Sequence, residues 1–302
     1  MSPANQPRQT KAERTAAARE KARQIREEQL KREKRNKLLL RWGVVAALVA
    51  VVAVVALVVT TSLRQNAPIA DTGPRAANSN QYGGVTLGKG TEVTAVPAST
   101  VDVASVPAPT SQPTAGQPAS APGVEASPAG EPVKVVLYID FICPACKQFE
   151  ATYGEKLTQL RDEGKVTVEY RAIGFLDRQS TTNYSSRAAN AAACVVNSTP
   201  QHYAAFVDEL MAQQPAEGGA GLSDDKLKEI ARGLGATIDQ CVEDKTYRPM
   251  VKYDTQLASA SGVTGTPTAF VDGKQWGIGE SAQQGFDQFV DAAVAAKVPA
   301  AA

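Results

Sequence analysis

The sequence predicts an α/β domain in which a βαβ unit and a ββα unit flank a helical insert. Three observations lead to this prediction: Val-rich apolar runs of strand length, helix-like spacing of apolar residues, and a return to strand period near residue 268. We expect the folded domain over residues 132–298 and the helical insert over about residues 178–261. About 165 residues suffice for one domain with its own core.

The N-terminal arm, residues 1–41, is basic and has almost no apolar face. It carries thirteen Lys and Arg against five Asp and Glu, a net charge of +8 that leaves −7 for residues 42–302. Its composition is typical of a solvated helix or a disordered arm. We expect a basic cytoplasmic arm that can lie against anionic lipids and does not bind nucleic acid.

An apolar run follows the arm and predicts one transmembrane helix over residues 42–63. Gly43 to Ser62 contains no charged residue, and twenty helical residues span about 30 Å of hydrocarbon. The charge excess before the run places the N-terminus in the cytoplasm and the remaining chain outside. A cleaved signal peptide is the alternative, although its basic region and apolar core would both be too long. We therefore expect a single-pass anchor in the cell membrane.

The segment between the apolar run and the domain, residues 64–131, is rich in Pro, Ala, Ser, Thr and Gly. Prolines recur so often from Val106 to Pro132 that no packed element is expected there. Gly88 to Val103 alternates weakly and could add an edge strand. The composition predicts an extended extracytoplasmic linker.

The first half of the domain has the pattern of a strand, a helix and a second strand. Val133 to Ile139 is a short apolar run typical of a buried strand. Pro144 to Leu160 has helical spacing of its apolar residues, and Val166 to Ala172 alternates as a strand. A strand, helix and strand in this order imply a right-handed parallel pair.

The second half begins with helices and ends with a hairpin and a helix. The expected helices of the insert are Thr182–Val196, Gln201–Met211, a helix that begins at the capping sequence Ser223-Asp224-Asp225 and ends at Leu234, Ile238–Lys245 and Tyr247–Ala260. The closing elements are a strand at Thr268–Val271, a turn at Asp272–Gly273, a strand at Lys274–Gly277 and an amphipathic helix at Ser281–Ala296.

Two cysteines stand where the first strand meets the first helix, in the sequence Cys143-Pro144-Ala145-Cys146. Pro144 suits the first helical turn, which puts Cys143 at the cap position. The unpaired N–H groups at a helix start stabilise a thiolate on Cys143, and Cys146 returns within its reach one turn later. A CxxC pair in this setting is typical of redox-active cysteines.

Two other interpretations of this pair were weighed. Half a zinc site would need a second Cys or His pair at short spacing, whereas Cys194 and Cys241 stand alone and His202 is the only histidine. A purely structural disulfide between Cys143 and Cys146 would close almost no loop. We therefore expect a redox pair, expect neither a metal nor an organic cofactor, and assign His202 no role.

Two motifs in the domain resemble the DsbA-like thiol–disulfide oxidoreductases in their membrane-tethered form. They are Phe141-Ile-Cys143-Pro-Ala-Cys146-Lys-Gln-Phe149-Glu150 and Gly262-Val-Thr-Gly-Thr266-Pro267-Thr-Ala-Phe270-Val-Asp-Gly273. Their order, with helices between them, makes the resemblance specific, and it covers roughly residues 132–297. It implies a thioredoxin fold with an inserted helical domain.

The resemblance also implies roles for individual residues. Cys143 is the exposed sulfur that forms the mixed disulfide with a client thiol, and the more buried Cys146 closes the disulfide again. Pro267 is expected to be cis and to turn the backbone of Thr266 toward an extended client strand. Taken alone, Pro267 fits equally well as a trans proline that begins an edge strand.

The dipeptide Pro144–Ala145 modulates the pair and departs from the best-known strong oxidant of the family, which has Pro-His there. The side chain of Ala145 can neither carry a charge nor form a hydrogen bond. We therefore expect the pKa of Cys143 to lie within about 3.5–7.5, but not at the lower end. A weaker thiolate means a less oxidising pair, so the direction of electron transfer stays open.

Cys194 and Cys241 fall on separate helices of the insert. Outside the cytoplasm, two lone cysteines in one domain tend to pair, so we predict a structural disulfide, with two buried free thiols as the alternative. In the chain-entropy model such a bond contributes about 4 kcal/mol.

The sequence thus predicts a membrane-anchored thiol–disulfide oxidoreductase that introduces disulfides into unfolded or reduced exported proteins. The resemblance implies a quinone-linked membrane partner of the DsbB or VKOR type that reoxidises it. An extracytoplasmic disulfide reductase or isomerase is the alternative enzyme. An anchored thioredoxin-like binding or scaffold domain is the non-enzyme alternative.

Overall fold

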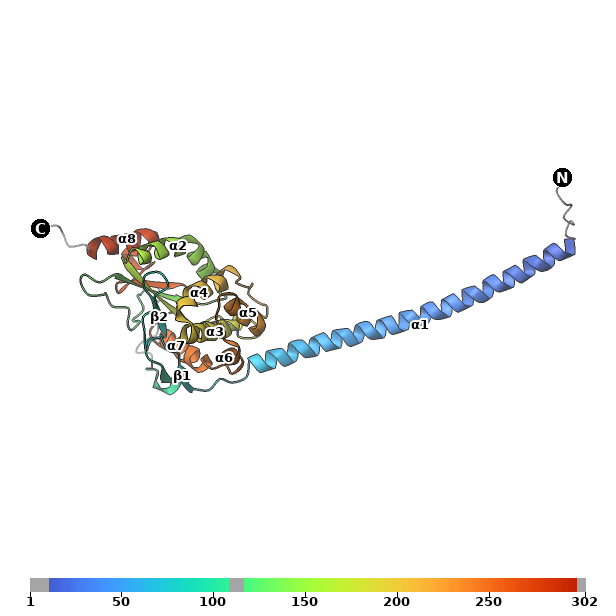
Figure 1. Cartoon of the computed structure of the whole chain (residues 1–302), viewed down its shortest axis with the longest axis horizontal. Coiled ribbons are helices and arrows are strands. Elements are labelled where there is room, and N and C mark those ends of the chain that lie inside the picture. The colour runs from blue at the N-terminus through green and yellow to red at the C-terminus, as the bar shows by residue number, and fades with distance from the viewer. Residues whose placement is uncertain (1–10, 109–116, 298–302) are drawn as a thin grey trace, which may run out of the picture. The chain divides into compact units, whose positions relative to one another are not determined.

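The computed structural model of the chain describes residues 11–108 and 117–297 and divides into two units, Met1–Thr61 and Ser62–Ala302 (Figure 1). The described part of the first unit is helical throughout and belongs to α1 (Lys11–Gln65). Within the described residues, α1 is the one helix long and apolar enough to cross a membrane, and none of its residues is buried. The expected span over residues 42–63 lies inside this helix, and the basic arm continues it.

A five-stranded sheet forms the centre of the second unit, with the strand order β2-β5-β4-β6-β7. Its strands are β2 (Gly84–Leu87), β4 (Val133–Ile139), β5 (Val166–Ala172), β6 (Thr268–Val271) and β7 (Lys274–Gln275). A separate two-stranded sheet pairs β1 (Thr72–Arg75) antiparallel with β3 (Ser99–Asp102).

The helices of the second unit follow β4 in the chain. They are α2 (Pro144–Asp162), α3 (Tyr184–Ser198), α4 (Tyr203–Ala212), α5 (Asp224–Gly233), α6 (Asp239–Glu243), α7 (Arg248–Ala260) and α8 (Phe286–Lys297). Short 3₁₀ turns lie at Val103–Ser105, Asp177–Gln179, Pro200–His202 and Gly279–Ser281. The last of these turns explains why α8 begins five residues later than predicted.

The pairing of the strands confirms the predicted fold. β4 runs parallel to β5, with Val133 opposite Val166, and antiparallel to β6, with Val135 opposite Val271. The turn between β6 and β7 places Asp272 and its neighbouring glycine at positive φ, as a two-residue hairpin requires. Because α3 to α7 lie between β5 and β6 in the chain, the architecture is a thioredoxin fold with inserted helices.

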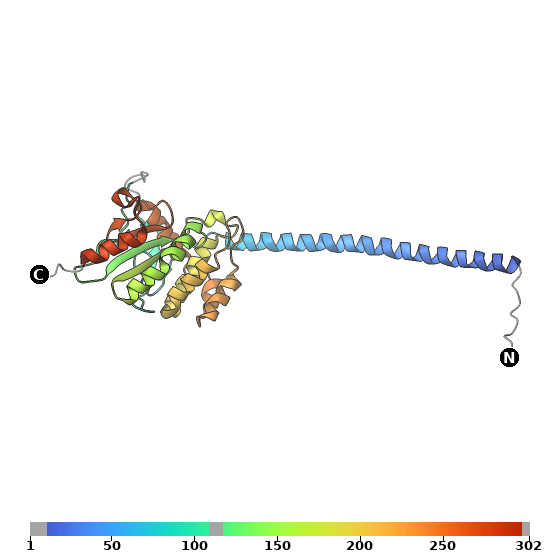
Figure 2. The same ribbon diagram turned by 90° about the horizontal axis from the view of Figure 1, so that it is seen from above.

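Strand β4 is buried on both faces because its side chains alternate between two hydrophobic clusters. Val135 and Leu137 belong to the cluster that includes residues of α2 and α8. Val136 belongs to the cluster on the other face, which includes Ala258 of α7. α2 and α8 lie side by side over the sheet (Figures 1 and 2), and aromatic rings join them, with 4.8 Å between the ring centroids of Phe149 and Phe286.

The linker prediction for residues 64–131 is wrong for most of that segment. β2 extends the central sheet by pairing antiparallel with β5, with Val85 opposite Tyr170. Ala76 and Val101 are also buried in the core. The domain therefore begins well before residue 132, and the part of the proline-rich run at residues 109–116 lies outside the described residues.

Polar contacts also hold this segment against the domain. Arg75 and Asp254 of α7 form a buried ion pair at 2.8 Å. Arg171 of β5 donates a hydrogen bond to the carbonyl oxygen of Pro122 at 2.7 Å. The composition misled the prediction because these contacts use backbone groups and distant charged partners, which leave no periodic apolar pattern in the sequence.

Candidate active site

The CxxC pair lies directly after β4, at the start of α2. Cys143 is the N-cap residue and Pro144 is the first helical residue, as the sequence predicted. The backbone N–H of Cys143 donates to the carbonyl oxygen of Asp140 at 3.0 Å, and that of Cys146 donates to the carbonyl oxygen of Cys143 at 3.0 Å. The first helical turn thereby brings the two cysteines together.

The loop before β6 meets this helix start from the opposite side. The Cys143 thiol donates a hydrogen bond to the carbonyl oxygen of Thr266 at 3.1 Å. The peptide bond between Thr266 and Pro267 is cis, as predicted. The fold therefore joins the two motifs, although 123 positions separate Cys143 from Thr266.

The two sulfur atoms differ in their acidity. The pKa of Cys143 is lowered to about 6, chiefly by a hydrogen bond from the Cys146 thiol and further by the side chain of Thr266 and the backbone N–H groups of Ala145 and Cys146, against the opposing effect of burial. The pKa of Cys146 is raised, chiefly by burial and then by the hydrogen bond and charge of Cys143. At neutral pH the pair therefore holds one thiolate, on Cys143, and one thiol. The value for Cys143 lies inside the predicted range.

Cys143 is less exposed than the sequence led us to expect. Its exposed fraction is 5%, against 0% for Cys146. It reaches solvent through a cleft of about 740 Å³, whose apolar wall includes Phe175 and Val263 and whose rim includes Glu217. A reacting group must therefore enter the cleft to meet the sulfur.

Asp140 is a site residue that the sequence analysis missed. It is fully buried, and its carboxylate oxygens accept hydrogen bonds from the backbone N–H groups of Ile142 at 3.0 Å and Leu176 at 2.9 Å. Burial raises its pKa to about 6. Asp140 thus ties the turn before Cys143 to the cleft wall. An Asp three residues before a helix cap, directly after a strand, is a signal for such a turn.

The loop after α4 also reaches the helix start. The Gln214 side chain donates to the carbonyl oxygen of Cys143 at 2.9 Å. The Lys147 ammonium donates to the carbonyl oxygen of Ala212 at 3.2 Å, at the end of α4. The insert therefore supports the redox helix directly. No local pattern predicts these contacts, because they join segments far apart in the chain.

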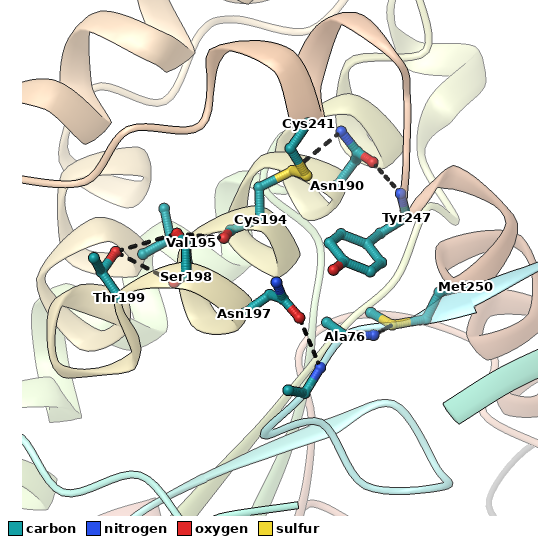
Figure 3. Close-up of a disulfide and its surroundings, with 11 residues drawn as sticks. Ala76, Asn190, Cys194, Val195, Asn197, Ser198, Thr199, Cys241, Tyr247 and Met250 are labelled. Atoms are coloured by element: carbon teal, nitrogen blue, oxygen red, sulfur yellow. Dashed lines mark hydrogen bonds between the residues drawn. A yellow bond between two sulfur atoms is a disulfide. The ribbon is translucent and has the colours of Figure 1, made fainter. Parts of the chain in front are cut away.

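Cys194 of α3 and Cys241 of α6 form a disulfide, as predicted, with their Cα atoms 6.0 Å apart (Figure 3). Next to it, the Asn190 side chain accepts a hydrogen bond from the backbone N–H of Tyr247 at 2.8 Å, just before α7. The bond and this contact hold α6 and the start of α7 against α3. Within residues 11–108 and 117–297, no group of three or more His, Cys, Asp or Glu could hold a metal ion.

The sequence of the folded unit is similar to those of several known proteins. The family model described as thioredoxin matches residues 129–292. Serine/threonine-protein kinase PknE of Mycobacterium tuberculosis is 31% identical over 160 residues, which are 49% of this chain and 28% of the kinase. Disulfide bond formation protein D of Bacillus subtilis is 26% identical over 148 residues, which are 47% of this chain and 64% of that protein.

Solved structures of other proteins are also similar to the folded unit. Reduced DsbA from Mycobacterium tuberculosis has 29% sequence identity and a TM-score of 0.46, over 59% of this chain and 97% of that one. This chain covers less than two thirds of the length of the two curated relatives named above. The match to the family model, which covers residues 129–292, agrees with the fold that the sequence resemblance implied.

Proposed function

Since the chain belongs to the thioredoxin family, we propose that it is a thiol–disulfide oxidoreductase of the DsbA-like kind and that it introduces disulfides into exported proteins. One observation carries the proposal. A low-pKa sulfur, Cys143, sits at a helix start beside a cleft, with the buried Cys146 as its partner.

In the proposed reaction the pair begins as a disulfide. A client thiolate attacks the sulfur of Cys143, the bond to Cys146 breaks, and Cys146 leaves with the electron pair and takes up a proton. A second client thiolate then attacks the client sulfur of the mixed disulfide and releases Cys143 as a thiolate. Two electrons pass from the client to the pair, and the client gains one disulfide.

The surroundings of Cys143 favour this direction. A stabilised thiolate on Cys143 makes it a good leaving group in the last step and stabilises the reduced form, which makes the disulfide more oxidising. The backbone of Thr266 faces the same sulfur and is placed to pair with an extended client strand. The apolar wall of the cleft suits a client that is still unfolded.

The cellular setting is part of the proposal. α1 serves as an uncleaved single-pass anchor with the basic arm in the cytoplasm, and the folded unit works outside the membrane. Reoxidation of the reduced pair falls to a quinone-linked membrane partner of the DsbB or VKOR type. Unfolded or reduced exported proteins are the clients.

A reductase or isomerase is the second candidate, and Ala145 favours it. The side chain of Ala145 adds no charge or hydrogen bond to the thiolate, so the pair is expected to oxidise less strongly than one with Pro-His. The equilibrium reduction potential separates an oxidant or isomerase from a reductase. A value of about −120 to −180 mV supports an oxidant or isomerase, and about −270 mV supports a reductase.

The measurement uses the full chain in detergent, equilibrated with glutathione buffers and alkylated. The mass of the peptide that holds Cys143 and Cys146 gives the reduced fraction. Ala145→His is the matched variant and should shift the potential toward a stronger oxidant. A pair that never exchanges with glutathione would rule out the enzyme and leave the binding or scaffold domain.

A further inference from the structure

A second cleft of the folded unit, well separated in sequence from the CxxC pair, contains a buried arginine. The cleft has a volume of about 360 Å³. Its walls include residues 66–69, the start of α3 at Asn183, and Arg248 and Lys252 of α7. None of the cysteines lines it. It is therefore a separate candidate site.

Arg248 is the main feature of this cleft. Its side chain is 4% exposed, and two of its guanidinium nitrogens, Nε and Nη1, are buried without a hydrogen-bond partner in the described structure. Buried charged groups are normally paired, because burial without a partner is costly. A guanidinium presents its N–H groups in a planar fork that matches the oxygens of phosphate or carboxylate.

Two helix starts strengthen the preference of the cleft for an anion. Arg248 is the first residue of α7, and Asn183 is the N-cap residue of α3. These helices have 13 and 15 residues, so each presents a full positive dipole end. The N–H groups of Tyr184, Ser186 and Arg248 are already bonded to Ser180, Asp177 and Lys245, so the helix starts contribute their dipoles and not free donors.

The neighbouring charged groups already have partners, which leaves Arg248 available for a ligand. These pairs are Asp177 with the backbone N–H of Ser186 at 2.9 Å and with its hydroxyl at 2.5 Å, Arg187 with Asp224 at 2.7 Å, and Lys252 with Asp71 at 2.6 Å. Asp177 lines the cleft as well and attracts the guanidinium of Arg248 electrostatically without a hydrogen bond to it, so its negative charge limits the affinity for an anion.

We propose that this cleft binds a phosphate group, with the guanidinium of Arg248 as its principal ligand. The chain also indicates a source. Residues 66–69 directly follow α1 in the chain, so only a few residues of chain separate this wall of the cleft from the anchor proposed above. A phospholipid head group and free inorganic phosphate share the required chemistry, and the experiment below distinguishes them.

The first arm tests free phosphate on the full chain in a maltoside detergent. Thermal unfolding is followed by circular dichroism, with inorganic phosphate compared with chloride at equal ionic strength. At ten times the dissociation constant, phosphate should raise the unfolding midpoint by about 3–5 °C. Arg248→Met should lose this rise, and because the substitution removes an unpaired buried charge, its midpoint without phosphate should not fall below that of the wild type.

Two further variants serve as controls for this test. Arg232→Met, which changes an exposed arginine of α5, should keep the full rise. Arg248→Lys keeps the charge but loses the fork, and should bind phosphate about tenfold more weakly. An unchanged rise in Arg248→Met would overturn the proposal.

The second arm reconstitutes the full chain in vesicles of phosphatidylglycerol or of a galactolipid without phosphate. A higher midpoint in phosphatidylglycerol alone, lost in Arg248→Met, assigns the ligand to the lipid. Equal midpoints in the two vesicles, with a rise on adding free phosphate, assign it to the free anion. No effect of either source would mean that only solvent fills the cleft, and the proposal would fail.

Thiol exchange is measured in the same samples, so that failures can be told apart. Arg248→Met should exchange disulfides at the wild-type rate, because the cleft does not include the CxxC pair. Loss of exchange in the wild-type chain would count against the proposed function and leave the phosphate site untouched.

Discussion

The protein contains two cysteine pairs that differ in spacing along the chain, in position within their helices and in bonding. Cys143 and Cys146 share one helical turn at the start of α2, beside an open cleft. Cys194 and Cys241 lie 47 positions apart on α3 and α6, joined as a disulfide. The first pair brings together two nearby sulfurs of unequal acidity, and the second joins two distant helices.

The contrast shows that the position of a sulfur along a helix decides its chemistry. Cys143 precedes the first turn, where the hydrogen bond from the Cys146 thiol chiefly lowers its pKa to about 6 and the free N–H groups of the helix start add to the effect. Cys194 lies in the third turn of α3, where the N–H groups already bond within the helix, and it is only 2% exposed. The predictions below test this contrast, from the largest expected effect to the smallest.

Cys143→Ser should abolish disulfide exchange, whereas the double variant Cys194→Ser/Cys241→Ser should keep the rate within about a factor of two. The reason is that only Cys143 combines a lowered pKa with access to a cleft. The measurement is the rate at which the oxidised full chain oxidises a reduced model protein. Loss of activity in the double variant, with its fold intact, would contradict the contrast.

Cys146→Ser should accumulate mixed disulfides between Cys143 and client proteins, because the sulfur that resolves them is gone. Non-reducing electrophoresis followed by mass spectrometry identifies the trapped species. The same variant with Cys143→Ser added is the control and should trap nothing. Full turnover by Cys146→Ser alone, with no trapped species, would defeat the assignment.

Removing the second disulfide should lower the free energy of unfolding by about 4 kcal/mol, since the bond closes a long loop. Urea denaturation of Cys194→Ser/Cys241→Ser against the wild type measures the difference. Removing the CxxC disulfide by Cys143→Ser/Cys146→Ser should cost far less, because that loop holds only two residues between its cysteines. Equal losses of unfolding free energy in the two double variants would show that loop length does not determine how much each disulfide stabilises the fold.

The reactivity of Cys143 should follow its thiolate fraction with pH. With a folded pKa of about 6, the rate of alkylation should be half-maximal near pH 6 and fall about tenfold for each pH unit below it. Cys146, whose pKa is raised, should stay unmodified across this range. Mass mapping after brief iodoacetamide treatment gives both rates. An alkylation midpoint near the pKa of an ordinary thiol would show that the surroundings of Cys143 do not lower its pKa.

The smallest effect concerns Glu150, one turn after Cys146. Its Oε2 accepts a hydrogen bond from the Tyr170 hydroxyl at 3.2 Å, Oε1 is buried without a partner in the described structure, and burial raises its pKa from 4.5 to about 7. The folded state therefore holds this proton more tightly than the unfolded state, and stability declines as pH rises from about 4.5 through about 7.

Glu150→Gln imitates the protonated carboxyl and should remove this decline. We expect it to be more stable than the wild type by about 1–3 kcal/mol above pH 7 and equal to it near pH 4. Urea titrations at several pH values measure the difference. A constant difference at every pH would assign the effect to packing instead of the proton.

The features that the sequence predicted correctly are local ones. The strand at Val133–Ile139, the cap at Cys143 and the helix after it follow from residue spacing within about thirty positions. The cis bond before Pro267 and the pairing of Cys194 were inferred from the family resemblance and the redox compartment. These two are exceptions, because each depends on residues that lie far apart in the chain.

The features that it missed depend on distant partners. β2 was hidden because its partner, β5, lies far along the chain, and Arg75 finds its counter-ion Asp254 on α7. The contact of Gln214 with Cys143 likewise joins a loop of the insert to the redox helix. No spacing rule connects such residues, so composition alone suggested a linker.

The early position of β2 has a consequence for biosynthesis. Val85 pairs with Tyr170, which the ribosome adds 85 residues later, so β2 is made long before its neighbour. A strongly apolar strand would be prone to aggregate or to bind other chains during that interval. β2 is only four residues long and lies among glycine and threonine residues, so the segment exposes little apolar surface before its partner is made.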